Sequence, residues 1–494
     1  MIRELDADVV VIGSGAGGAT VAAECAAAGR RVVVLEEGPH VPPAEHAKMR
    51  PSQSLRHVWR DGGMTVAVGV GDTPMINVTM GKVVGGSSAI TGGVCLRPPE
   101  HVLHRWAHER GLAELTPEAF APYLDDVERM LRVEVVPEAM RSRSTQLFGL
   151  GLERRHGERL ESLSRNTVDC QGEGQCNFGC PHGRKQPVDV SVLPRALMAG
   201  AEIVPDCLVE RVRFRGRRAV GVDARLTTGR REHVHVHARD VVLAAGAWHD
   251  PLVLRASGLG RHKALGRHMT LHPSFRVMAR FAEPVRGWEG ALQSAVSKAF
   301  MHRGLTLVSL FIPPGIVAAT MPGVGPEHVA RARQIDHIAL FGGLVHDEGG
   351  GRVHGLPFMR EPIVSYRMAR ENRAIVPWVI RTMADIFFSA GALECYLPVL
   401  GLAPVTPDTI GGVPLERLHG SRFECTSQHP MGTCRMGADP GRSVIDGDGR
   451  PWDTEGLWVA DGSIVPTSLG VNPQVTIMAM ALRVARKLLD HPRA

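Results

Sequence analysis

Short apolar runs with the length of β-strands recur along this chain, and the first two enclose a stretch with helical composition. Residues 8–12 read Asp-Val-Val-Val-Ile and residues 31–35 read Arg-Val-Val-Val-Leu, with an Ala-rich segment between them. Apolar runs without alternation are typical of strands that are buried on both faces of a parallel sheet. The pattern therefore predicts a strand–helix–strand unit over residues 7–38.

Further strands and helices follow from the same kind of pattern. Helical spacing of apolar residues predicts a helix over residues 114–134, and a last helix is expected from near Pro473. Residues 265–425 contain more Pro, His and Arg with mixed strands, which indicates a separate domain. The other predicted strands lie at residues 201–204, 208–212, 219–222, 240–246, 305–311 and 457–461.

A glycine-rich turn joins the first predicted strand to the first helix. It reads Gly-Ser-Gly-Ala-Gly-Gly over residues 13–18. In such a turn Gly13 permits the tight bend, Gly15 lets the backbone approach a pyrophosphate, and Gly18 lets the helix pack closely on the strand. Glu36, at the end of the second strand, can accept hydrogen bonds from the hydroxyls of an adenosine ribose. The unit predicts a site for NAD or FAD.

Composition and charge narrow the class of protein. The chain has 494 residues, 44% hydrophobic and 22% charged, and contains no run of 18 uninterrupted apolar residues, so no membrane span is expected. The first core strand starts too early for a secretion signal, and a cytoplasmic enzyme is therefore predicted. The net charge of +6 is dispersed along the chain, which disfavours nucleic acid as a partner.

Five further motifs carry a family resemblance. They include Gly-Lys-Val-Val-Gly-Gly-Ser-Ser at 81–88, Ser-Gln-His-Pro-Met-Gly-Thr-Cys-Arg-Met-Gly at 427–437, and Gly-Val-Asn-Pro-Gln-Val-Thr-Ile at 470–477. The other two lie at residues 250–260 and 459–466. In this order, and over residues 7 to about 490, they resemble the glucose–methanol–choline (GMC) oxidoreductases. The resemblance favours FAD over NAD.

The resemblance also implies an architecture. It predicts an α/β fold, α+β when the whole chain is counted. A Rossmann-like FAD-binding domain would comprise residues 1–264 and 426–494, with excursions at 39–79 and 160–190. A substrate-binding domain, built on a mostly antiparallel sheet, would comprise residues 265–425.

The catalytic pair is implied by the same resemblance. His429 corresponds to the catalytic base and Asn472 to its partner. A histidine suits this task because its neutral ring can take a hydroxyl proton as hydride leaves the carbinol carbon. Asn472 followed by Pro473 is also typical of the N-cap and first position of a helix, so Asn472 has a structural reading as well.

The remaining implied contacts are with the cofactor. Gly85, Gly86 and Ser87 correspond to residues beside the flavin, and Asp461 to an acid near the ribityl or pyrophosphate part of FAD. Asp461 also has a simpler reading as a turn residue before a glycine.

Two positions depart from the family pattern. Thr91 stands where Asn is frequent, and Asp250 stands where Ser or Thr is usual. Neither departure removes a chemical group that the reaction needs. No histidine lies beside Gly85 and Gly86, so FAD is expected to bind without a covalent link.

The function implied is oxidation of an alcohol to an aldehyde or ketone by hydride transfer to flavin N5, with oxygen or another electron acceptor. A sugar-like or amino-sugar primary alcohol is the preferred substrate. Long-chain or sterol-type alcohols are one alternative, and a sugar dehydrogenase subunit containing an iron–sulfur cluster is another. Outside this mechanism, a nicotinamide-dependent dehydrogenase or an electron-relay flavoprotein stays open.

Three of the nine cysteines form a separate candidate site. Cys170, Cys176 and Cys180 lie in a glycine-rich loop, and the lack of a secretion signal makes disulfides improbable. Three thiolates at this spacing suit an iron–sulfur cluster, which some GMC dehydrogenases carry on a similar loop. A purely structural loop and a zinc site with His182 as fourth ligand are the alternatives.

Overall fold

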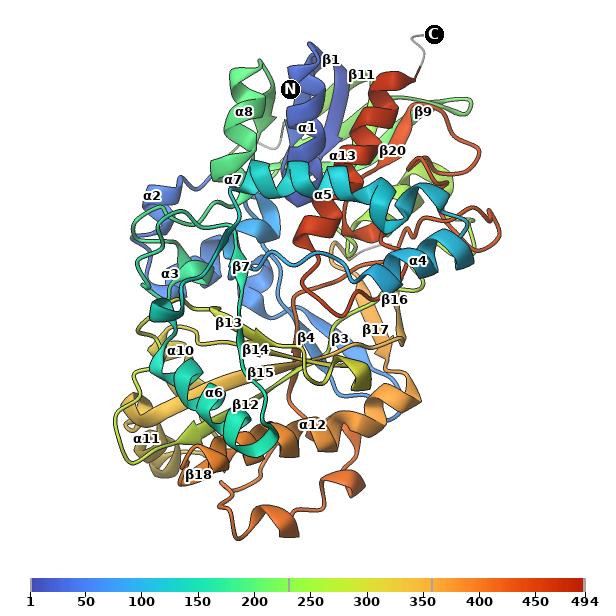
Figure 1. Cartoon of the computed structure of the whole chain (residues 1–494). Coiled ribbons are helices and arrows are strands. Elements are labelled where there is room, and N and C mark those ends of the chain that lie inside the picture. The colour runs from blue at the N-terminus through green and yellow to red at the C-terminus, as the bar shows by residue number, and fades with distance from the viewer. Residues whose placement is uncertain (1, 230–231, 357–358, 492–494) are drawn as a thin grey trace.

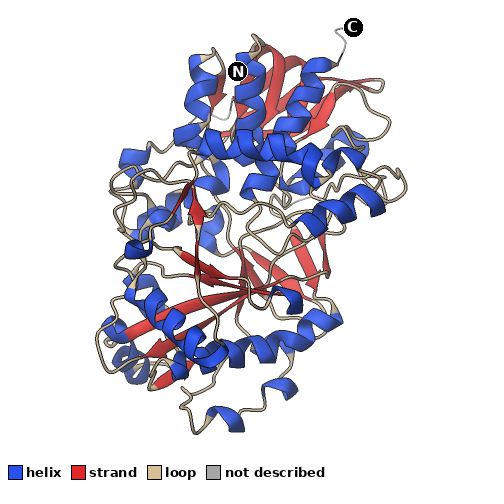
Figure 2. Cartoon of the chain, in the orientation of Figure 1, coloured by secondary structure: helices blue, strands red, loops and turns tan. Residues whose placement is uncertain are grey.

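The chain is built around two β-sheets, one above the other in Figure 1. The computed structural model describes residues 2–229, 232–356 and 359–491. Figure 2 shows that helices lie against both sheets and that long loops run between them. The mixed α/β fold predicted from the sequence is confirmed.

The first sheet has seven strands, most of them parallel. Its order is β8-β2-β1-β11-β10-β9, and β20 pairs with β11. Strand β1 is bonded in parallel to both β2 and β11, and residues 9–12 of β1 are fully buried. The strands are β1 (Ile2–Ile12), β2 (Val32–Leu35), β8 (Glu202–Val204), β9 (Cys207–Arg215), β10 (Arg218–Leu226), β11 (His233–Leu243) and β20 (Leu457–Val459).

Helices from both ends of the chain cover one face of this sheet. Figure 1 shows α1 (Ala16–Ala27) next to α13 (Gln474–Asp490), with α5 (Pro117–Leu131) lying across them. Helix α1 packs on α13 and on α8 (Leu193–Met198), and α13 also packs on α5. The small residues of α1 allow this close approach, since eight of its twelve residues are buried.

The second sheet has eleven strands and is mostly antiparallel. Its order is β16-β17-β3-β4-β19-β12-β15-β14-β13-β6, with β18 paired to β12. The pairs β17–β3 and β19–β4 are parallel, and the other pairs among the described residues are antiparallel. The strands are β3 (Val66–Gly69), β4 (Ile76–Val78), β6 (Glu161–Ser162), β12 (Ser274–Arg280), β13 (Ala295–Ser297), β14 (Leu305–Ser309), β15 (Ile338–Val345), β16 (Gly350–His354), β17 (Ile363–Arg367), β18 (Glu394–Tyr396) and β19 (Cys425–Ser427).

Two long helices close the core of the second sheet. Helix α12 (Arg370–Ser389) packs on β12 and β15, and α6 (Arg143–His156) packs on α12 and β15. Phe148 of α6 stacks on Phe341 of β15 with ring centroids 3.7 Å apart. The remaining helices are α2 (Pro43–His46), α3 (Pro51–His57), α4 (Glu100–Glu109), α7 (Val188–Ser191), α9 (Asp250–Leu254), α10 (Pro314–Ala319) and α11 (Pro326–Ala332), and a small pair β5 (Glu134–Val135) and β7 (Ser164–Arg165) stands apart.

Candidate active site

A cleft of about 850 Å³ opens where the two sheets meet. Parallel strands β1, β2, β11 and β20 end at its wall, which is where open α/β sheets bind ligands. Residues 428–430, which follow β19 of the second sheet, form part of the opposite wall. The lining also includes the turn after β1, the end of β2, residues 86–88, residues 244–249 and residues 461–462.

The glycine turn has the geometry that its sequence predicts. Gly13 has φ +95°, and a Cβ there would lie 2.3 Å from the carbonyl oxygen of Ala244. A Cβ on Gly18 would lie 2.0 Å from the carbonyl oxygen of Gly13, so helix and strand pack as closely as expected. Gly15 lies on the cleft wall with no atom nearer than 3.9 Å to such a Cβ. Its backbone is therefore open to a ligand.

Glu36 is fixed on the cleft wall by the same turn. Its carboxylate accepts hydrogen bonds from the N–H of Ser14 (3.0 Å), the hydroxyl of Ser14 (2.7 Å) and the N–H of Gly38 (2.8 Å). Burial raises the pKa of Glu36, and these hydrogen bonds oppose that rise. The side chain is thus held as an acceptor at the end of β2.

The second glycine segment touches the first. Gly85 is left-handed with φ +95°, and its N–H donates to the hydroxyl of Ser14 at 3.0 Å. A Cβ on Gly86 would lie 2.8 Å from Cα of Gly15, and both Gly86 and Ser87 line the cleft. Thr91, outside the cleft lining, donates from its hydroxyl to the carbonyl of Ser88 at 3.2 Å.

Asp461 and Asp250 form a buried carboxyl pair behind the cleft wall. Asp461 accepts from the N–H groups of Gly246 (2.6 Å) and Ser463 (2.7 Å) and lines the cleft. Asp250 accepts from the N–H of Ala245 (2.9 Å) and from the hydroxyl of Ser463 (2.7 Å). Burial, and then repulsion by Asp461, raises the pKa of Asp250 well above its usual value. The turn reading of Asp461 also holds, since it caps the short helix Gly462–Ile464.

His429 and Asn472 meet although 43 residues separate them. Nε2 of His429 lies 3.2 Å from the side-chain nitrogen of Asn472. Asn472 does not cap helix α13, because Pro473 is the N-cap residue and helix α13 begins at Gln474, so the predicted capping role of Asn472 is wrong. Its amide is instead free to face the histidine, and its Oδ1 is buried without a partner.

A second histidine, His272, holds His429 from the other side. The two Nδ1 atoms are 3.0 Å apart, and Nε2 of His272 accepts from the N–H groups of Leu469 (3.2 Å) and Gly470 (3.0 Å). Burial lowers the pKa of His429 to about 4 and that of His272 well below its usual range. Both rings are therefore neutral near pH 7.

The three loop cysteines line one small cavity, but their side chains are not placed to hold a metal ion together. Cys176 is buried, whereas Cys170 and Cys180 are half-buried, and His182 lies on the same cavity. Within the parts of the chain that the structure describes, no three His, Cys, Asp or Glu side chains are placed to hold a metal ion. The iron–sulfur and zinc predictions thus receive no support from this geometry.

Family models match most of the chain. The GMC oxidoreductase N-terminal model matches residues 8–274, and the C-terminal model matches residues 354–481. The chain belongs to the GMC oxidoreductase family. The predicted family is confirmed, and with it the class of flavin-dependent oxidoreductases acting on alcohols and related donors.

Relatives of this GMC chain extend over nearly its whole length. An uncharacterised GMC-type oxidoreductase of Mycobacterium tuberculosis is 38% identical over 97% of this chain and 75% of its own length. A long-chain-alcohol oxidase of Arabidopsis thaliana is 26% identical over 99% of this chain and 67% of its own length. Both relatives are thus similar to this chain over nearly its whole length.

A solved structure gives the same fold. The structure is that of a formate oxidase of Aspergillus oryzae, determined to show the effect of a mutation on FAD modification. It superposes with a TM-score of 0.72 over 99% of both chains at 18% identity. Family and fold together support FAD as the cofactor of this GMC enzyme. No helix within the described residues combines the length and apolarity that crossing a membrane requires.

Sequence reasoning missed His272 and Ser14. His272 is one of 23 histidines and lies 157 residues before His429, so spacing gives no sign of their contact. Ser14 sits inside the glycine turn, where a hydroxyl that bridges Glu36 and Gly85 could have been foreseen from the motif.

Proposed function

We propose that this GMC oxidoreductase oxidises a primary alcohol to an aldehyde with FAD held non-covalently in the cleft. The observation that carries the proposal is the pairing of His429 with Asn472, because His429 lines the same cleft as the glycine turn and Glu36. One cavity thus combines acceptors for the adenosine end of a cofactor with a neutral base.

The residues present fit FAD. The exposed backbone of Gly15 and Gly86 would hold the pyrophosphate, at the N-terminal end of α1, and Glu36 would accept from the ribose. Asp461, which follows β20 on the same wall as the glycine turn, would contact the ribityl or pyrophosphate part. When bound, FAD supplies the acceptor for the hydride that leaves the carbinol carbon.

His429 would take the hydroxyl proton at Nε2, and the amide of Asn472 would hold the substrate oxygen. Asn472 adds no charge, and its Oδ1 is buried without a partner, which leaves an acceptor available to a ligand and supports this role. Because His429 is neutral above about pH 4, it can act as a base over the whole neutral range.

His272 controls which nitrogen of His429 carries the proton. Two N–H groups donate to Nε2 of His272, so its own proton lies on Nδ1 and points at Nδ1 of His429. In that arrangement Nδ1 of His429 accepts from His272, so the ring proton of neutral His429 is on Nε2. Nε2 takes the hydroxyl proton only in the other tautomer, in which the ring proton is on Nδ1, Nε2 faces the side-chain nitrogen of Asn472 at 3.2 Å as an acceptor, and the His272 contact opens.

The substrate class that we favour is a primary alcohol on an apolar chain. The long-chain-alcohol oxidase match covers 99% of the chain, and this supports an aliphatic substrate over the sugar-like alcohol expected from the sequence. The sugar-like substrate stays a prediction, to be tested beside the other.

An anaerobic panel of alcohols tests the whole proposal. The purified yellow protein should bleach with one class of alcohol, and the His429→Ala variant should keep FAD without bleaching. Exposure to air then shows whether oxygen restores the colour. Bleaching by reduced nicotinamide alone, or unchanged turnover in His429→Ala, would rule the proposal out.

A further inference from the structure

Gly470 connects the two members of the catalytic pair through its backbone. It lies two residues before Asn472, and its N–H donates to Nε2 of His272 at 3.0 Å. His272 in turn faces His429, with the two Nδ1 atoms 3.0 Å apart. A contact that fixes the backbone of Gly470 therefore also sets how Asn472 lies relative to His429.

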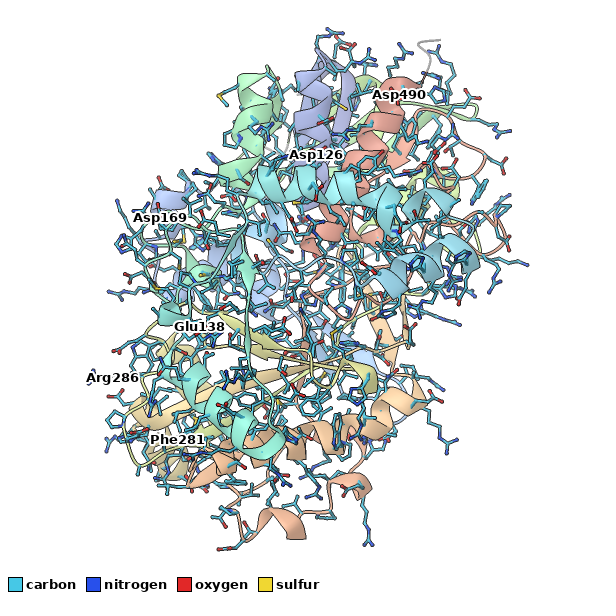
Figure 3. The ribbon with its side chains drawn as sticks, in the orientation of Figure 1. Asp126, Glu138, Asp169, Phe281, Arg286 and Asp490 are labelled. Atoms are coloured by element: carbon cyan, nitrogen blue, oxygen red, sulfur yellow. The ribbon has the colours of Figure 1, made fainter. Side chains whose placement is uncertain are left out.

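The carbonyl side of Gly470 is bound from the second sheet. Side chains fill the space between the two sheets (Figure 3), and Gly470 follows β20 of the first sheet. Thr306 lies in β14 and His346 follows β15, both in the second sheet. The hydroxyl of Thr306 donates to the carbonyl of Gly470 at 3.3 Å and lies 2.7 Å from Nε2 of His346. These contacts thus join the second sheet to the loop that carries Asn472.

The ring of His346 lies directly against the Cα atom of Gly470. Gly470 has φ +72°, and a Cβ there would lie 2.6 Å from Nδ1 and 2.8 Å from both Cγ and Cε1 of His346. Any other residue at this position would strain the backbone and displace the ring. Gly470 therefore has a partner at its N–H, its Cα and its carbonyl, so its conformation is fixed from three sides.

The hydrogen bonds of Thr306 and His346 run in one direction. A carbonyl oxygen only accepts, so the hydroxyl hydrogen of Thr306 points at Gly470, and the hydroxyl oxygen accepts from Nε2–H of His346. Burial, and then repulsion by His101, lowers the pKa of His346 to about 4. The ring is therefore neutral near pH 7, with its one proton on Nε2.

We propose that Thr306 and His346 are positioning residues, which hold the amide of Asn472 beside the reacting oxygen through the backbone of Gly470. The inference rests on the proposed function, because the task it assigns to Asn472 belongs to alcohol oxidation. The two side chains take no part in proton or hydride transfer. Without the Thr306 hydroxyl, the Gly470 carbonyl loses its partner, and the peptide groups between it and Asn472 can rotate. The Asn472 amide then leaves its place 3.2 Å from Nε2 of His429.

Substitutions of Thr306 separate its hydroxyl group from its bulk. Thr306→Val removes the hydroxyl and keeps the shape, whereas Thr306→Ser, the matched control, keeps the hydroxyl. With FAD-loaded enzyme and the alcohol that bleaches the wild type, Thr306→Val should slow anaerobic flavin reduction roughly tenfold or more. Thr306→Ser should recover most of that rate, and the FAD content of both variants should match that of the wild type. Flavin reduction at the wild-type rate in Thr306→Val overturns the proposal.

A double-mutant cycle shows whether Thr306 acts through Asn472. Asn472→Ala removes the amide, so adding Thr306→Val should slow flavin reduction by less than about twofold further. If the two losses multiply instead, Thr306 acts on another part of the site and the proposal fails. Should Thr306→Val not fold, His346→Phe takes its place in both experiments, because it keeps a ring against Gly470 and removes the Nε2 donor.

Crystal structures of the two FAD-loaded Thr306 variants decide the positioning role if no alcohol bleaches the wild type, an outcome that rejects the proposed function alone. In Thr306→Ser the side-chain nitrogen of Asn472 should stay 3.2 Å from Nε2 of His429, as in the wild type. In Thr306→Val it should move away by about 1 Å. An unchanged position of Asn472 in Thr306→Val overturns the positioning role, whichever substrate the enzyme oxidises.

Discussion

The two walls of the cleft are built in different ways. The wall formed by the glycine turn and Glu36 comes from residues 7–38, one local unit whose shape is set by short contacts within it. The wall with His429 is assembled from distant segments, because His272, His429 and Asn472 come from three separate loops. Substitutions in the first, local wall should therefore impair folding and FAD binding. Substitutions in the second, assembled wall should impair the reaction alone.

The largest expected effect lies in the local wall. Gly13→Ala places a Cβ 2.3 Å from the oxygen of Ala244, at a residue with φ +95°. We therefore expect the free energy of unfolding to fall by about 3 kcal/mol or more, and the variant to be purified without FAD. Gly29→Ala is the matched control, since its φ is +74° but its surroundings are open. Flavin content and thermal unfolding measure both, and equal behaviour of the two variants would contradict the close packing.

The assembled wall should show the reverse pattern. His429→Ala should lower kcat by roughly 10²–10⁴-fold while the flavin content stays at the wild-type level. Rapid anaerobic mixing with a bleaching alcohol measures the loss directly. Loss of FAD in this variant would mean that the assembled wall is also needed for FAD binding, contrary to the comparison.

A smaller effect concerns pH. Because the folded pKa of His429 is lowered to about 4, neutral His429 persists to low pH, and kcat/KM should fall only below about pH 4. His272→Gln keeps an acceptor for the amides of Leu469 and Gly470 but removes the N–H that faces His429. Protonated His429 then loses a repulsive neighbour, so the acidic limb should move up by ~1 pH unit. His272→Asn, which keeps an N–H near Nδ1, should leave the limb in place.

The smallest effect tests Asp250, the departure noted from the family pattern. Its folded pKa is raised, so its contribution to stability is present below the unfolded pKa and is lost as pH rises through the folded one. Asp250→Asn removes this dependence and keeps the acceptor for Ala245. The difference in free energy of unfolding between the variant and the wild type should therefore shift by about 1 kcal/mol in favour of the variant from pH 5 to pH 8. Unfolding curves of both proteins at the two pH values measure this shift. Parallel pH dependence in the two proteins would mean that Asp250 stays ionised.

The local wall could be predicted from residues alone, and the assembled wall could not. Glycine spacing and the terminal acid predict Gly18 and Glu36 from one strand–helix–strand unit, within which Gly18 packs on Gly13 and Glu36 accepts from Ser14. Gly13 and Gly15 were predicted from the same spacing, although they also face the distant residues Ala244 and Gly86. The His429–Asn472 pair was expected only through the family resemblance. His272 gave no signal, since its contact depends on how β12 is placed beside β19.

Among the strands, too, those with a clear local apolar pattern were predicted, and those that depend on distant neighbours in the sheet were not. Strands β8, β9, β10, β14 and β20 lie where apolar patterns predict them, with ends that differ by a few residues. β11 overlaps its predicted range but begins at His233, seven residues before the predicted start at Asp240. The excursion at 39–79 was expected to be irregular, yet β3 and β4 within it join the second sheet. Such short strands are stabilised by their neighbours in the sheet, and a local pattern carries no information about those neighbours.

The position of β20 and α13 in the first sheet has a consequence for biosynthesis. β20 pairs with β11, and α13 packs against α1, so residues 457–490 complete a layer that residues 2–27 begin. Until residues 457–490 are synthesised, the flank of α1 that packs on α13 stays uncovered. A nascent chain stalled before residue 457 should thus be bound by chaperones, and FAD binding should follow the synthesis of residues 457–490.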